Sequence, residues 1–331
     1  MPNQLIDRFH RRITDLRVSV TDRCNLQCSY CMPPFGTTHV DRRELLTFEE
    51  IKRLVSLLAS QGIEKVRLTG GEPLIRRDLL QLVQMIQQIP GVGKIPMTTN
   101  AVLLCFYAGA LKESGLTSVN ISLDTLKRDH FQQVTGFDKF DQVMTGIHKA
   151  LDVGLPVKIN VVAIRNFNDA EVLEFVKLAG RLKVAVRFIE FMPFQNNQWS
   201  IEQFISTQEI QRIVESKYEL TPLEKEAPSS TSKNFRIGGQ EGTIGFIASM
   251  TESFCATCSR ARLTAEGYFR PCLHDNIEVD LKTPLRAGSS DQELLGLIQG
   301  AIWQKWAEHP DFLASSGRVT AGPREMVRIG G

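Results

Sequence analysis

Three cysteines near the amino terminus, Cys24, Cys28 and Cys31, have the spacing of a metal-binding loop. Their Cys-x3-Cys-x2-Cys pattern lets one short loop direct three sulfurs toward one centre. Thiolates favour soft metals, so an iron–sulfur cluster and a zinc ion are the two candidates. A structural zinc ion takes four protein ligands, whereas three cysteines on a cubane cluster leave one iron free to bind a small molecule. The spacing favours the cluster over a zinc knuckle with a distant fourth ligand.

A second triad, Cys255, Cys258 and Cys272, lies near the carboxyl terminus with Cys-x2-Cys-x13-Cys spacing. One interpretation is a structural zinc ion with His274 as its fourth ligand. The other is a second cluster with its own open iron. The segment 259–262 places two arginines beside this triad, and arginine makes bidentate contacts with phosphate. These arginines favour the second cluster, and whether His274 approaches the metal stays open.

The composition narrows the remaining classes of function. The chain has 331 residues, seven cysteines and a net charge of +2. Two groups of three cysteines and a lone Cys105 do not form a disulfide framework, and they fit a reducing cytoplasm. A near-neutral charge gives no indication of nucleic-acid binding. The sequence has no run of about 18 apolar residues and no signal peptide at its start, so we expect a cytoplasmic protein without a membrane span.

These residues must be positioned by the elements between them, and the first part of the chain alternates strand and helix patterns. The expected strands are Leu16–Val20, Lys65–Thr69, Ile95–Thr98, Ser118–Leu123, Val157–Ile164 and Val184–Phe191. The expected helices are Thr47–Ser60, Arg76–Ile89, Val102–Ser114, Phe140–Val153 and Asp169–Leu178. A capping box at Thr47 and Glu50 and a cap at Asn168 mark two helix starts. Alternating strands and helices predict a parallel sheet with right-handed crossovers. Since six units do not complete the usual eight, we predict an α/β fold, an open partial (βα)6 TIM-type barrel.

The pattern changes near residue 195, and we predict two domains, 1–194 and 195–331. The second is a smaller, mostly β extension that carries the second iron–sulfur site. A helical pattern at Thr207–Ser216 is followed by a linker at 223–234. The expected short strands are Phe235–Ile237, Thr243–Ala248, Ala261–Thr264 and Tyr268–Pro271, followed by a helical segment at Gln292–Glu308.

Alternation along the strands indicates what fills the barrel. Side chains in a strand point alternately to opposite faces. Arg17 and Ser19 share one face of the first strand, and Arg67 and Thr69 share one face of the second, while Lys158 occupies the corresponding position in the fifth. A solvated outer face would also be polar, but helices should cover that side. We therefore predict a cationic, anion-binding barrel interior.

The most specific sequence motifs lie in the loops at the carboxyl ends of the strands, where barrel enzymes have their active sites. The cysteine loop follows the first strand, and Gly70-Gly71-Glu72-Pro73 follows the second. The two glycines allow the backbone to approach a ligand closely, and Pro73 can open the next helix. A Gly-Gly-Glu-Pro sequence alone is a moderate signal, but it becomes strong one strand–helix unit after a cysteine triad.

Together these motifs resemble the GTP 3′,8-cyclases, a family of the radical S-adenosylmethionine (SAM) superfamily. The segments that carry the resemblance are Thr21–Pro33, Lys65–Leu74, Asn120–Asp124, Arg187–Pro193, Phe254–Arg262 and Gly330–Gly331. The resemblance implies that SAM is cleaved to a 5′-deoxyadenosyl radical, which abstracts H3′ of GTP. The product would be (8S)-3′,8-cyclo-7,8-dihydroguanosine 5′-triphosphate, in the first step of molybdenum cofactor biosynthesis. It further implies two [4Fe–4S] clusters, a reductant protein and transfer of the product to a cyclic pyranopterin monophosphate synthase. It leaves open whether the protein forms a homodimer.

The resemblance also implies residue roles. Cys24, Cys28 and Cys31 would hold the SAM cluster, and Cys255, Cys258 and Cys272 the auxiliary cluster. The SAM pocket would include Tyr30, Gly71, Ser122 and Met192. The residues that contact GTP would be Arg17, Arg67, Thr98, Lys158, Arg260 and Arg262, with Arg17, Arg260 and Arg262 serving in catalysis.

The carboxyl-terminal Gly330-Gly331 would reach into the barrel near the substrate. The chain departs from the family pattern at Ala101, where a glycine is usual, and at 195–198, which lacks the expected glycines. Two alternatives from other classes remain. One is a radical SAM peptide-modifying enzyme with an auxiliary cluster, which would need a peptide groove. The other is a zinc-stabilised nucleotide- or RNA-binding module, which would need a basic patch with exposed aromatic residues.

Overall fold

A computed structural model describes residues 4–32, 39–195, 197–312 and 324–330 of the chain. Within these residues a twelve-stranded sheet has the order β12-β11-β10-β1-β2-β3-β4-β5-β6-β9-β8-β7. All neighbours from β10 through to β9 are parallel, and the strands at both ends of the sheet are antiparallel. In the described residues no helix is both long and apolar enough to cross a membrane.

The six predicted strands are all present. The strands are β1 (Asp15–Ser19), β2 (Lys65–Thr69), β3 (Pro96–Thr99), β4 (Ser118–Ser122), β5 (Val157–Ala163), β6 (Ala185–Glu190), β7 (Leu220–Pro222), β8 (Lys233–Ile237), β9 (Thr243–Ile247), β10 (Arg260–Leu263), β11 (Tyr268–Arg270) and β12 (Val279–Asp280). The α-helices are α1 (Phe48–Ser60), α2 (Leu79–Gln87), α3 (Leu104–Glu113), α4 (Arg128–Thr135), α5 (Phe140–Asp152), α6 (Val172–Leu182), α7 (Thr207–Glu215), α8 (Lys282–Arg286), α9 (Asp291–Gln304) and α10 (Met326–Ile329).

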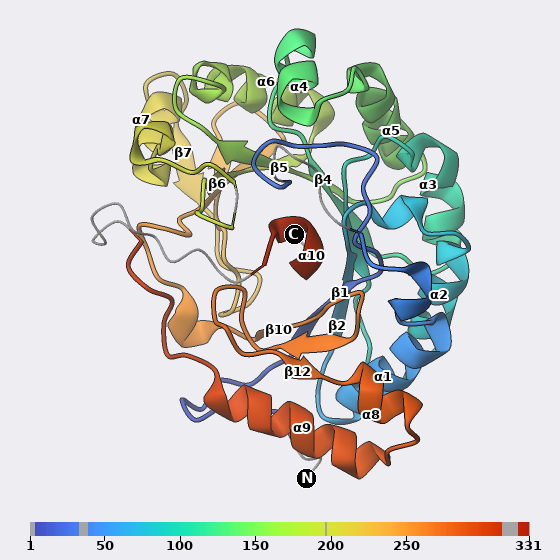
Figure 1. The fold of residues 1–331 in the computed structure, drawn as a ribbon. Coiled ribbons are helices and arrows are strands. Elements are labelled where there is room, and N and C mark those ends of the chain that lie inside the picture. The colour runs from blue at the N-terminus through green and yellow to red at the C-terminus, as the bar shows by residue number, and fades with distance from the viewer. Residues whose placement is uncertain (1–3, 33–38, 196, 313–323, 331) are drawn as a thin grey trace.

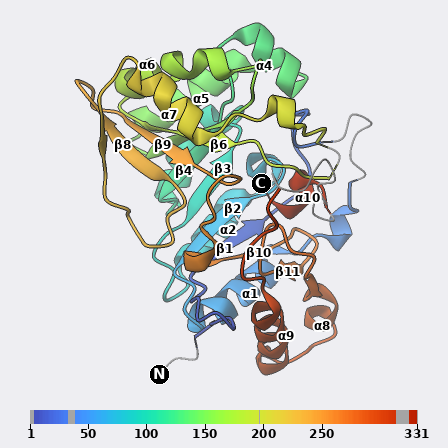
Figure 2. The same cartoon turned by 90° about the vertical axis from the view of Figure 1, so that its left-hand side faces the viewer.

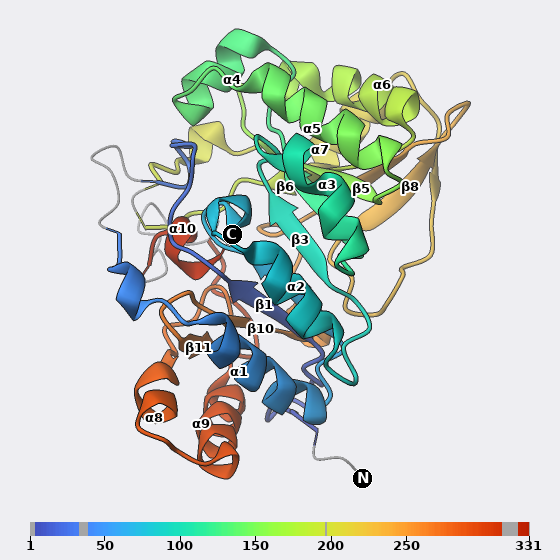
Figure 3. The same cartoon turned by 90° about the vertical axis from the view of Figure 1, so that its right-hand side faces the viewer.

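The parallel strands curve around a central space, and helices cover their outer face (Figure 1, Figure 3). The alternation in β1 shows how the sequence produces this layering. Leu16 and Val18 are fully buried on the helix side, while Arg17 between them faces the other way and is half-buried. Apolar burial of this kind is the main force that holds the helices on the sheet. The open partial barrel predicted from the sequence is confirmed.

The carboxyl-terminal extension completes this barrel wall on both sides. Strand β9 pairs in parallel with β6, and β10 pairs in parallel with β1. The sheet is therefore continuous across residue 194, where we placed a domain boundary. The division into two domains stays a prediction, but the extension contributes directly to the wall of the central space.

Of the two helix caps predicted from the sequence, one is present and the other is not. The Thr47 side chain accepts a hydrogen bond from the Glu50 N–H, and the Glu50 carboxylate accepts one from the Thr47 N–H, so the predicted capping box starts α1. Asn168 makes no cap with its side chain. Its amide instead bonds the backbone of Ile164 and Asp124, because tertiary partners at the end of β4 satisfy it better. Helix α4 was missed because its first turn is strongly polar.

Candidate functional site

The first cysteine triad lies in the loop after β1, at the carboxyl end of the parallel strands. Burial raises the pKa of Cys24 to about 11 and that of Cys31 to about 12. Burial also raises the pKa of Cys28 well above its ordinary value, and the charges of Cys31 and Cys24 add to this effect. The three sulfurs are thus within electrostatic reach of one another. They retain their protons until a metal centre displaces them, as buried thiol ligands do.

The two glycines that follow β2 pack directly on this cysteine loop. A Cβ atom on Gly71 would lie 2.0 Å from the Arg23 carbonyl oxygen, and one on Gly70 would lie 2.6 Å from the Thr21 carbonyl oxygen. The Gly71 N–H donates to the Thr21 carbonyl at 2.8 Å. Only glycine permits this contact. The predicted link between the two motifs is therefore a close backbone approach.

Glu72 is fully buried, and its carboxylate is engaged by the protein itself. It accepts hydrogen bonds from the Leu74 N–H at 3.0 Å, the Thr99 hydroxyl at 2.8 Å and the Asn100 N–H at 2.7 Å. Burial outweighs these bonds and raises the pKa of Glu72 to about 7. Asn100 also directs its amide to the Cys24 sulfur at 3.6 Å. Glu72 therefore holds the end of β3 against the cysteine loop.

Two of the residues assigned to a SAM pocket, Tyr30 and Gly71, lie in or against this loop, and Ser122 and Met192 lie at or just after the ends of two other strands. The Tyr30 hydroxyl donates to Asp124 at 2.5 Å, and the Val162 N–H donates to the other Asp124 oxygen at 2.8 Å. Burial raises the pKa of Asp124 to about 6. Ser122 ends β4, two residues before Asp124. The carbonyl of Met192 follows β6 and accepts from the Asn197 amide at 2.8 Å.

The predicted cations line the inner face of the sheet in register. Arg17 of β1 lies opposite Arg67 of β2 on one side and Arg262 of β10 on the other. Thr98 lies opposite Asn120, which in turn lies opposite Lys158. Register pairing across parallel strands keeps these residues on one face. The alternation in the sequence therefore predicted correctly which of these residues face the barrel interior, called the lumen below, while anion binding there stays a prediction.

Burial lowers the pKa values of these guanidiniums strongly. It lowers the pKa of Arg17 and of Arg67 to about 10, and that of Arg262 well below its ordinary value. Neighbouring arginines lower all three further. Buried N–H groups of Arg17, Arg67 and Arg260 have no hydrogen-bond partner among the described residues. Such unpaired donors are costly, so the arrangement calls for an anionic ligand.

Sequence reasoning missed a further cation, Arg187 of β6. Burial lowers its pKa to about 10, and the charge of Arg17 contributes. Its Nε is also buried without a partner in the described part of the chain. A Cβ on Gly245, opposite it in β9, would lie 2.9 Å from the Arg187 side chain, so glycine leaves it room. Alternation in Val184–Phe191 could have identified Arg187 as a residue of the inner face.

Lys158 differs from the arginines because it has a partner. Its ammonium lies 3.0 Å from the carboxylate of Glu226, which belongs to the segment between β7 and β8. The Glu226 side chain is 66% exposed, so this ion pair is open to exchange. Lys158 is therefore in the predicted row but is not free.

The second triad lies at the amino ends of the parallel strands, opposite the first triad. Cys255 and Cys258 immediately precede β10, which runs parallel to β1, and Cys272 follows β11, which runs antiparallel to β10. The Ser259 carbonyl accepts from the N–H groups at the start of β1, which fixes this loop at the amino ends of the strands. The two cysteine triads thus lie at opposite ends of the cationic lumen.

Charges around the second triad favour a thiolate. Burial raises the pKa of Cys258, but Arg260 and Lys305 outweigh this effect and lower it to about 6. Burial raises the pKa of Cys272. In the described residues no three histidine, cysteine or acidic side chains are arranged to hold a metal ion. Cluster cysteines do not share one atom, because each binds its own iron.

The ring of His274 belongs to an aromatic cluster. Its ring stacks on Phe194 at 5.5 Å between centroids and packs against Phe312 at 5.0 Å. Burial, followed by the charge of His309, lowers the pKa of His274 to about 3, so its imidazole is neutral. This aromatic packing engages the ring and does not favour it as a fourth ligand.

A buried glutamate holds the segment that leads to the second triad. Glu190, at the end of β6, accepts hydrogen bonds from the N–H groups of Met250 and Thr251 and from the Thr251 hydroxyl. It also accepts from Thr207 at the start of α7. The sequence did not predict this structural role of Glu190. An acidic residue at the end of a strand resembles a ligand-binding group until its hydrogen-bond partners in the fold are known.

The carboxyl-terminal tail enters the lumen. Helix α10 lies inside the ring of strands (Figure 1). Arg262 donates to the carbonyls of Ile329 at 3.2 Å and Gly330 at 2.5 Å. Gly330 adopts φ +73, and a Cβ there would lie 2.4 Å from the Thr69 hydroxyl oxygen. The predicted position of the tail is confirmed as far as Gly330, while Gly331 lies outside the described residues.

Both departures from the family pattern occur at left-handed backbone. Ala101 has φ +63 and Gln198 has φ +53, conformations in which glycine carries no penalty. The backbone of the glycine turn is therefore present without the glycine. Asn196 lies outside the described residues.

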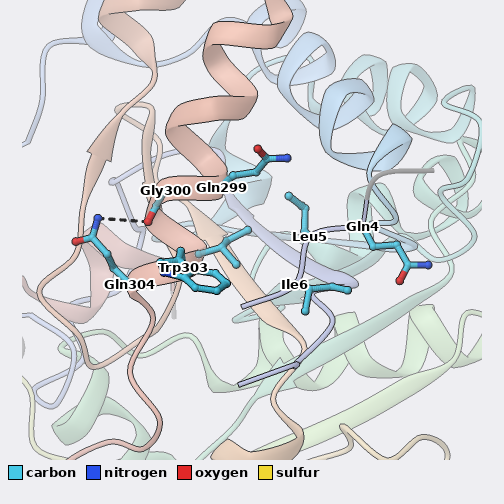
Figure 4. Close-up of a pocket in the computed structure, with 8 residues that line it drawn as sticks. Gln4, Leu5, Ile6, Gln299, Gly300, Trp303 and Gln304 are labelled. Carbon is cyan, nitrogen blue, oxygen red and sulfur yellow. Dashed lines mark hydrogen bonds between the residues drawn. The ribbon is translucent and has the colours of Figure 1, made fainter. Parts of the chain in front are cut away.

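The hollows on the outer surface lie away from this site. One, of about 520 Å³, is lined by amino-terminal residues and by the end of α9, including Leu5 and Trp303 (Figure 4). It contains none of the predicted site residues. The chemistry is therefore concentrated in the lumen and at its two ends.

Two family models match this chain, one after the other along the sequence. The family model for the radical SAM superfamily matches residues 18–179. The model for Molybdenum Cofactor Synthesis C matches residues 184–310.

Two bacterial relatives match almost the whole chain. A GTP 3′,8-cyclase of Desulforamulus reducens is 45% identical over 92% of this chain and 95% of its own length. One of Moorella thermoacetica is 43% identical over 98% of this chain and 99% of its own length. The molybdenum cofactor biosynthesis protein 1 of Homo sapiens is 44% identical over 94% of this chain, which corresponds to 49% of the human protein.

Among solved structures, that of SuiB from Streptococcus suis has a TM-score of 0.60. It covers 90% of this chain and 67% of SuiB at 14% identity. A likeness at this identity supports the fold alone.

Proposed function

The chain belongs to the GTP 3′,8-cyclases of the radical SAM superfamily, and from this membership we propose the roles of its site residues. The chain is an enzyme that converts GTP to (8S)-3′,8-cyclo-7,8-dihydroguanosine 5′-triphosphate, the first step of molybdenum cofactor biosynthesis. It uses SAM and two [4Fe–4S] clusters.

The thiols present fit these clusters. We assign Cys24, Cys28 and Cys31 to the cluster that binds SAM, because their pKa values are coupled and they lie beside the glycine loop. The auxiliary cluster is assigned to the other triad, whose ligands are Cys255, Cys258 and Cys272. When bound, the first cluster supplies the electron that cleaves SAM and so generates the radical that abstracts H3′ of GTP. The protein itself binds and orients SAM and GTP, and it excludes water from them.

The SAM pocket is proposed at the carboxyl end of the strands. Gly71 brings its backbone to the rim of the cysteine loop, and Asp124 fixes the ring of Tyr30 from below. Ser122 and the backbone of Met192 border the same space at the ends of β4 and β6. Hydrogen bonds within the protein already hold Tyr30, the Gly71 backbone and the Met192 carbonyl, which reduces the cost of ordering them on binding.

The triphosphate and ribose are assigned to the cationic lumen. Arg17, Arg260 and Arg262 lie between the two triads, and we propose that they position GTP for the reaction. The remaining proposed contacts are Arg67, Thr98 and Lys158, together with Arg187, which was absent from the sequence prediction. The buried N–H groups of Arg17, Arg67, Arg187 and Arg260 that lack a partner among the described residues can form charge-assisted bonds with phosphate oxygens without first losing a protein partner.

One observation carries this assignment. The first cysteine triad follows β1 at the carboxyl end of the parallel strands, the second lies at their amino end, and the arginines occupy the inner face between them. A substrate held by these arginines would face a cluster at each end. A peptide-modifying enzyme would have no need of this buried cationic row. A nucleic-acid-binding module would present its cations on the surface.

The test is an anaerobic assay of the purified protein with GTP, SAM and dithionite. We expect 5′-deoxyadenosine and a cyclised nucleotide triphosphate of the same mass as GTP, separable from it by chromatography. Deuterium at C3′ of GTP should appear in 5′-deoxyadenosine. Formation of 5′-deoxyadenosine without deuterium transfer would contradict the proposed positioning of GTP.

We further propose a cytoplasmic location, a reductant protein and transfer of the product to a cyclic pyranopterin monophosphate synthase. None of the seven cysteines, all of which lie in the described residues, forms a disulfide, which supports a reducing compartment. Cleavage of SAM consumes an electron, so a donor is needed. A homodimer is also proposed, and size-exclusion chromatography with light scattering tests it directly.

A further inference from the structure

Lys305 is a buried lysine beside the second triad, and the reaction described above gives it no role. It caps the carboxyl end of α9 and is 1% exposed. Its ammonium donates to the Arg260 carbonyl at 2.7 Å and lies 3.5 Å from the Cys258 sulfur. A lysine is rarely buried to this degree without a partner of opposite charge.

The side chain in direct contact with the Lys305 ammonium is that of Cys258. Among the described residues no carboxylate forms an ion pair with this ammonium. Asp275 lies within electrostatic reach of Lys305 but forms no ion pair with it among the described residues. Cys258 is in direct contact instead, and its sulfur, which would be a thiolate as a cluster ligand, is the group that the ammonium meets.

A second cation keeps this geometry fixed. Arg11 donates to the Cys255 carbonyl at 2.8 Å and to the carbonyls of Ala307 and Trp306 at 2.8 and 2.6 Å. Asp7 holds the same guanidinium at 2.6 Å. Arg11 therefore links the loop of the second triad to the two residues that directly follow Lys305. Helix α9, whose carboxyl end is capped by Lys305, lies below β10 and β11 (Figure 2).

We propose that Lys305 is a positioning residue that raises the reduction potential of the auxiliary cluster through its N–H···S contact with Cys258. This inference rests on the proposed assignment of that cluster to Cys255, Cys258 and Cys272. Reduction adds one negative charge to the cluster, and a fixed cation stabilises the reduced form more than the oxidised form. Hydrogen bonds to cluster sulfurs and nearby charge are known levers on such potentials. Low local polarity strengthens the effect.

The experiment is a redox titration of the anaerobic, fully loaded enzyme, with dithionite as reductant and electron paramagnetic resonance as readout. GTP should perturb the signal of the auxiliary cluster, and SAM that of the other cluster, which assigns each midpoint. In Lys305→Met the equilibrium constant for reducing the auxiliary cluster should fall about tenfold, equivalent to about 59 mV for one electron. The midpoint of the SAM cluster should not move.

Three variants make the result specific. Lys305→Arg keeps the charge and should stay near the wild-type midpoint. Lys305→Gln keeps a donor for the Arg260 carbonyl without the charge, and replaces the Met variant if that protein loses iron. Lys112→Met removes a lysine that also donates to a carbonyl, at 2.6 Å, but on α3, and should change neither midpoint.

The outcomes separate this proposal from the proposed function. A wild-type protein without a GTP-sensitive cluster signal would overturn the cluster assignment itself. If the signal is present and the midpoint in Lys305→Met or Lys305→Gln equals that of the wild type at full iron content, the role of Lys305 is wrong. An equal shift in Lys305→Arg would also overturn the charge argument.

Discussion

Arg262 and Gly330 meet inside the lumen, where the guanidinium donates to the glycine carbonyl at 2.5 Å. Arg262 also lies opposite Arg17 in the sheet. One side chain therefore joins the carboxyl-terminal tail to the row of cations assigned to GTP. The position of the tail and the position of the substrate are linked through this residue.

The first prediction concerns the fit of Gly330. In Gly330→Ala the new Cβ would lie 2.4 Å from the Thr69 hydroxyl oxygen, at φ +73. We expect the tail to leave its place and cyclisation to fall about a hundredfold, since displacements near 1 Å have effects of this size. Cluster content and SAM cleavage should be largely retained.

Gly239→Ala is the matched control. Gly239 has the same φ of +73, but nothing lies within 4 Å of its Cβ position. This variant should carry the backbone strain without the clash and keep its cyclisation rate. Equal rates in the two variants would remove the tail from the site.

The second prediction concerns the two triads, which lie at opposite ends of the lumen. Replacing Cys24, Cys28 or Cys31 with Ala should abolish both 5′-deoxyadenosine formation and GTP turnover. Replacing Cys255, Cys258 or Cys272 should reduce GTP binding and cyclisation more than SAM cleavage. Cys105→Ala, on α3, should leave both unchanged. Separate roles would be refuted by equal loss of SAM cleavage in both sets of folded variants.

The third prediction concerns Arg187, which has a buried N–H without a partner in the described residues. Hydrogen bonds to charged groups contribute about 1.5–3 kcal/mol, so Arg187→Gln should weaken GTP binding roughly ten- to a hundredfold. Calorimetry under anaerobic conditions measures this change. Arg181→Gln, on the exposed side of α6, is the control and should bind GTP normally. Unchanged affinity in Arg187→Gln would exclude that residue from the site.

The fourth prediction concerns the ion pair of Lys158 with Glu226. If Lys158 contacts GTP, the carboxylate competes with the substrate for its ammonium. Glu226→Gln should then bind GTP as tightly as the wild type or more tightly, while Lys158→Met should bind about tenfold more weakly. Equal weakening in both variants would mean that the pair serves the fold and not the substrate.

The fifth prediction concerns pH and Glu72. Burial raises the pKa of this carboxyl from its ordinary 4.5 to about 7. Between these two values the folded protein binds more protons than the unfolded chain, so the free energy of unfolding falls as pH rises. Glu72→Gln should remove this part of the pH dependence, although it also loses hydrogen-bond acceptors.

Thermal unfolding of the loaded protein between pH 5 and pH 8 measures the effect of Glu72. The wild type should lose more stability over this range than Glu72→Gln. Glu64→Gln, at a glutamate whose side chain is 63% exposed, should follow the wild type. Parallel curves for all three proteins would show that Glu72 does not titrate as described.

Local sequence patterns predicted much of this site. Period-two alternation depends only on neighbouring residues, so the inward positions of Arg17, Arg67 and Lys158 could be predicted before the structure. The cysteine spacings were equally local. The same reasoning applied to β6 would have identified Arg187, which lies between the inward-facing Ala185 and Ile189.

Other features depend on partners far away in the chain. Nothing in the short segments Thr243–Ile247 and Arg260–Leu263 indicates that they pair in parallel with β6 and β1. The roles of Glu72 and Glu190 were also hidden, because a buried carboxylate is recognised as structural only from the donors around it. The position of the second triad at the opposite end of the lumen followed from the pairing of β10.

The pairing of β1 with β10 has a consequence for how the protein is made. Strand β1 leaves the ribosome early, but the strand that covers its free edge comes late, since chains are synthesised from the amino terminus. Until then the edge beside the first cysteine loop is open to pairing with other chains. A chain cut near residue 194 would expose this edge and that of β6 permanently. We therefore expect the amino-terminal part to aggregate when expressed alone, and the first cluster to be inserted stably only after translation is almost complete.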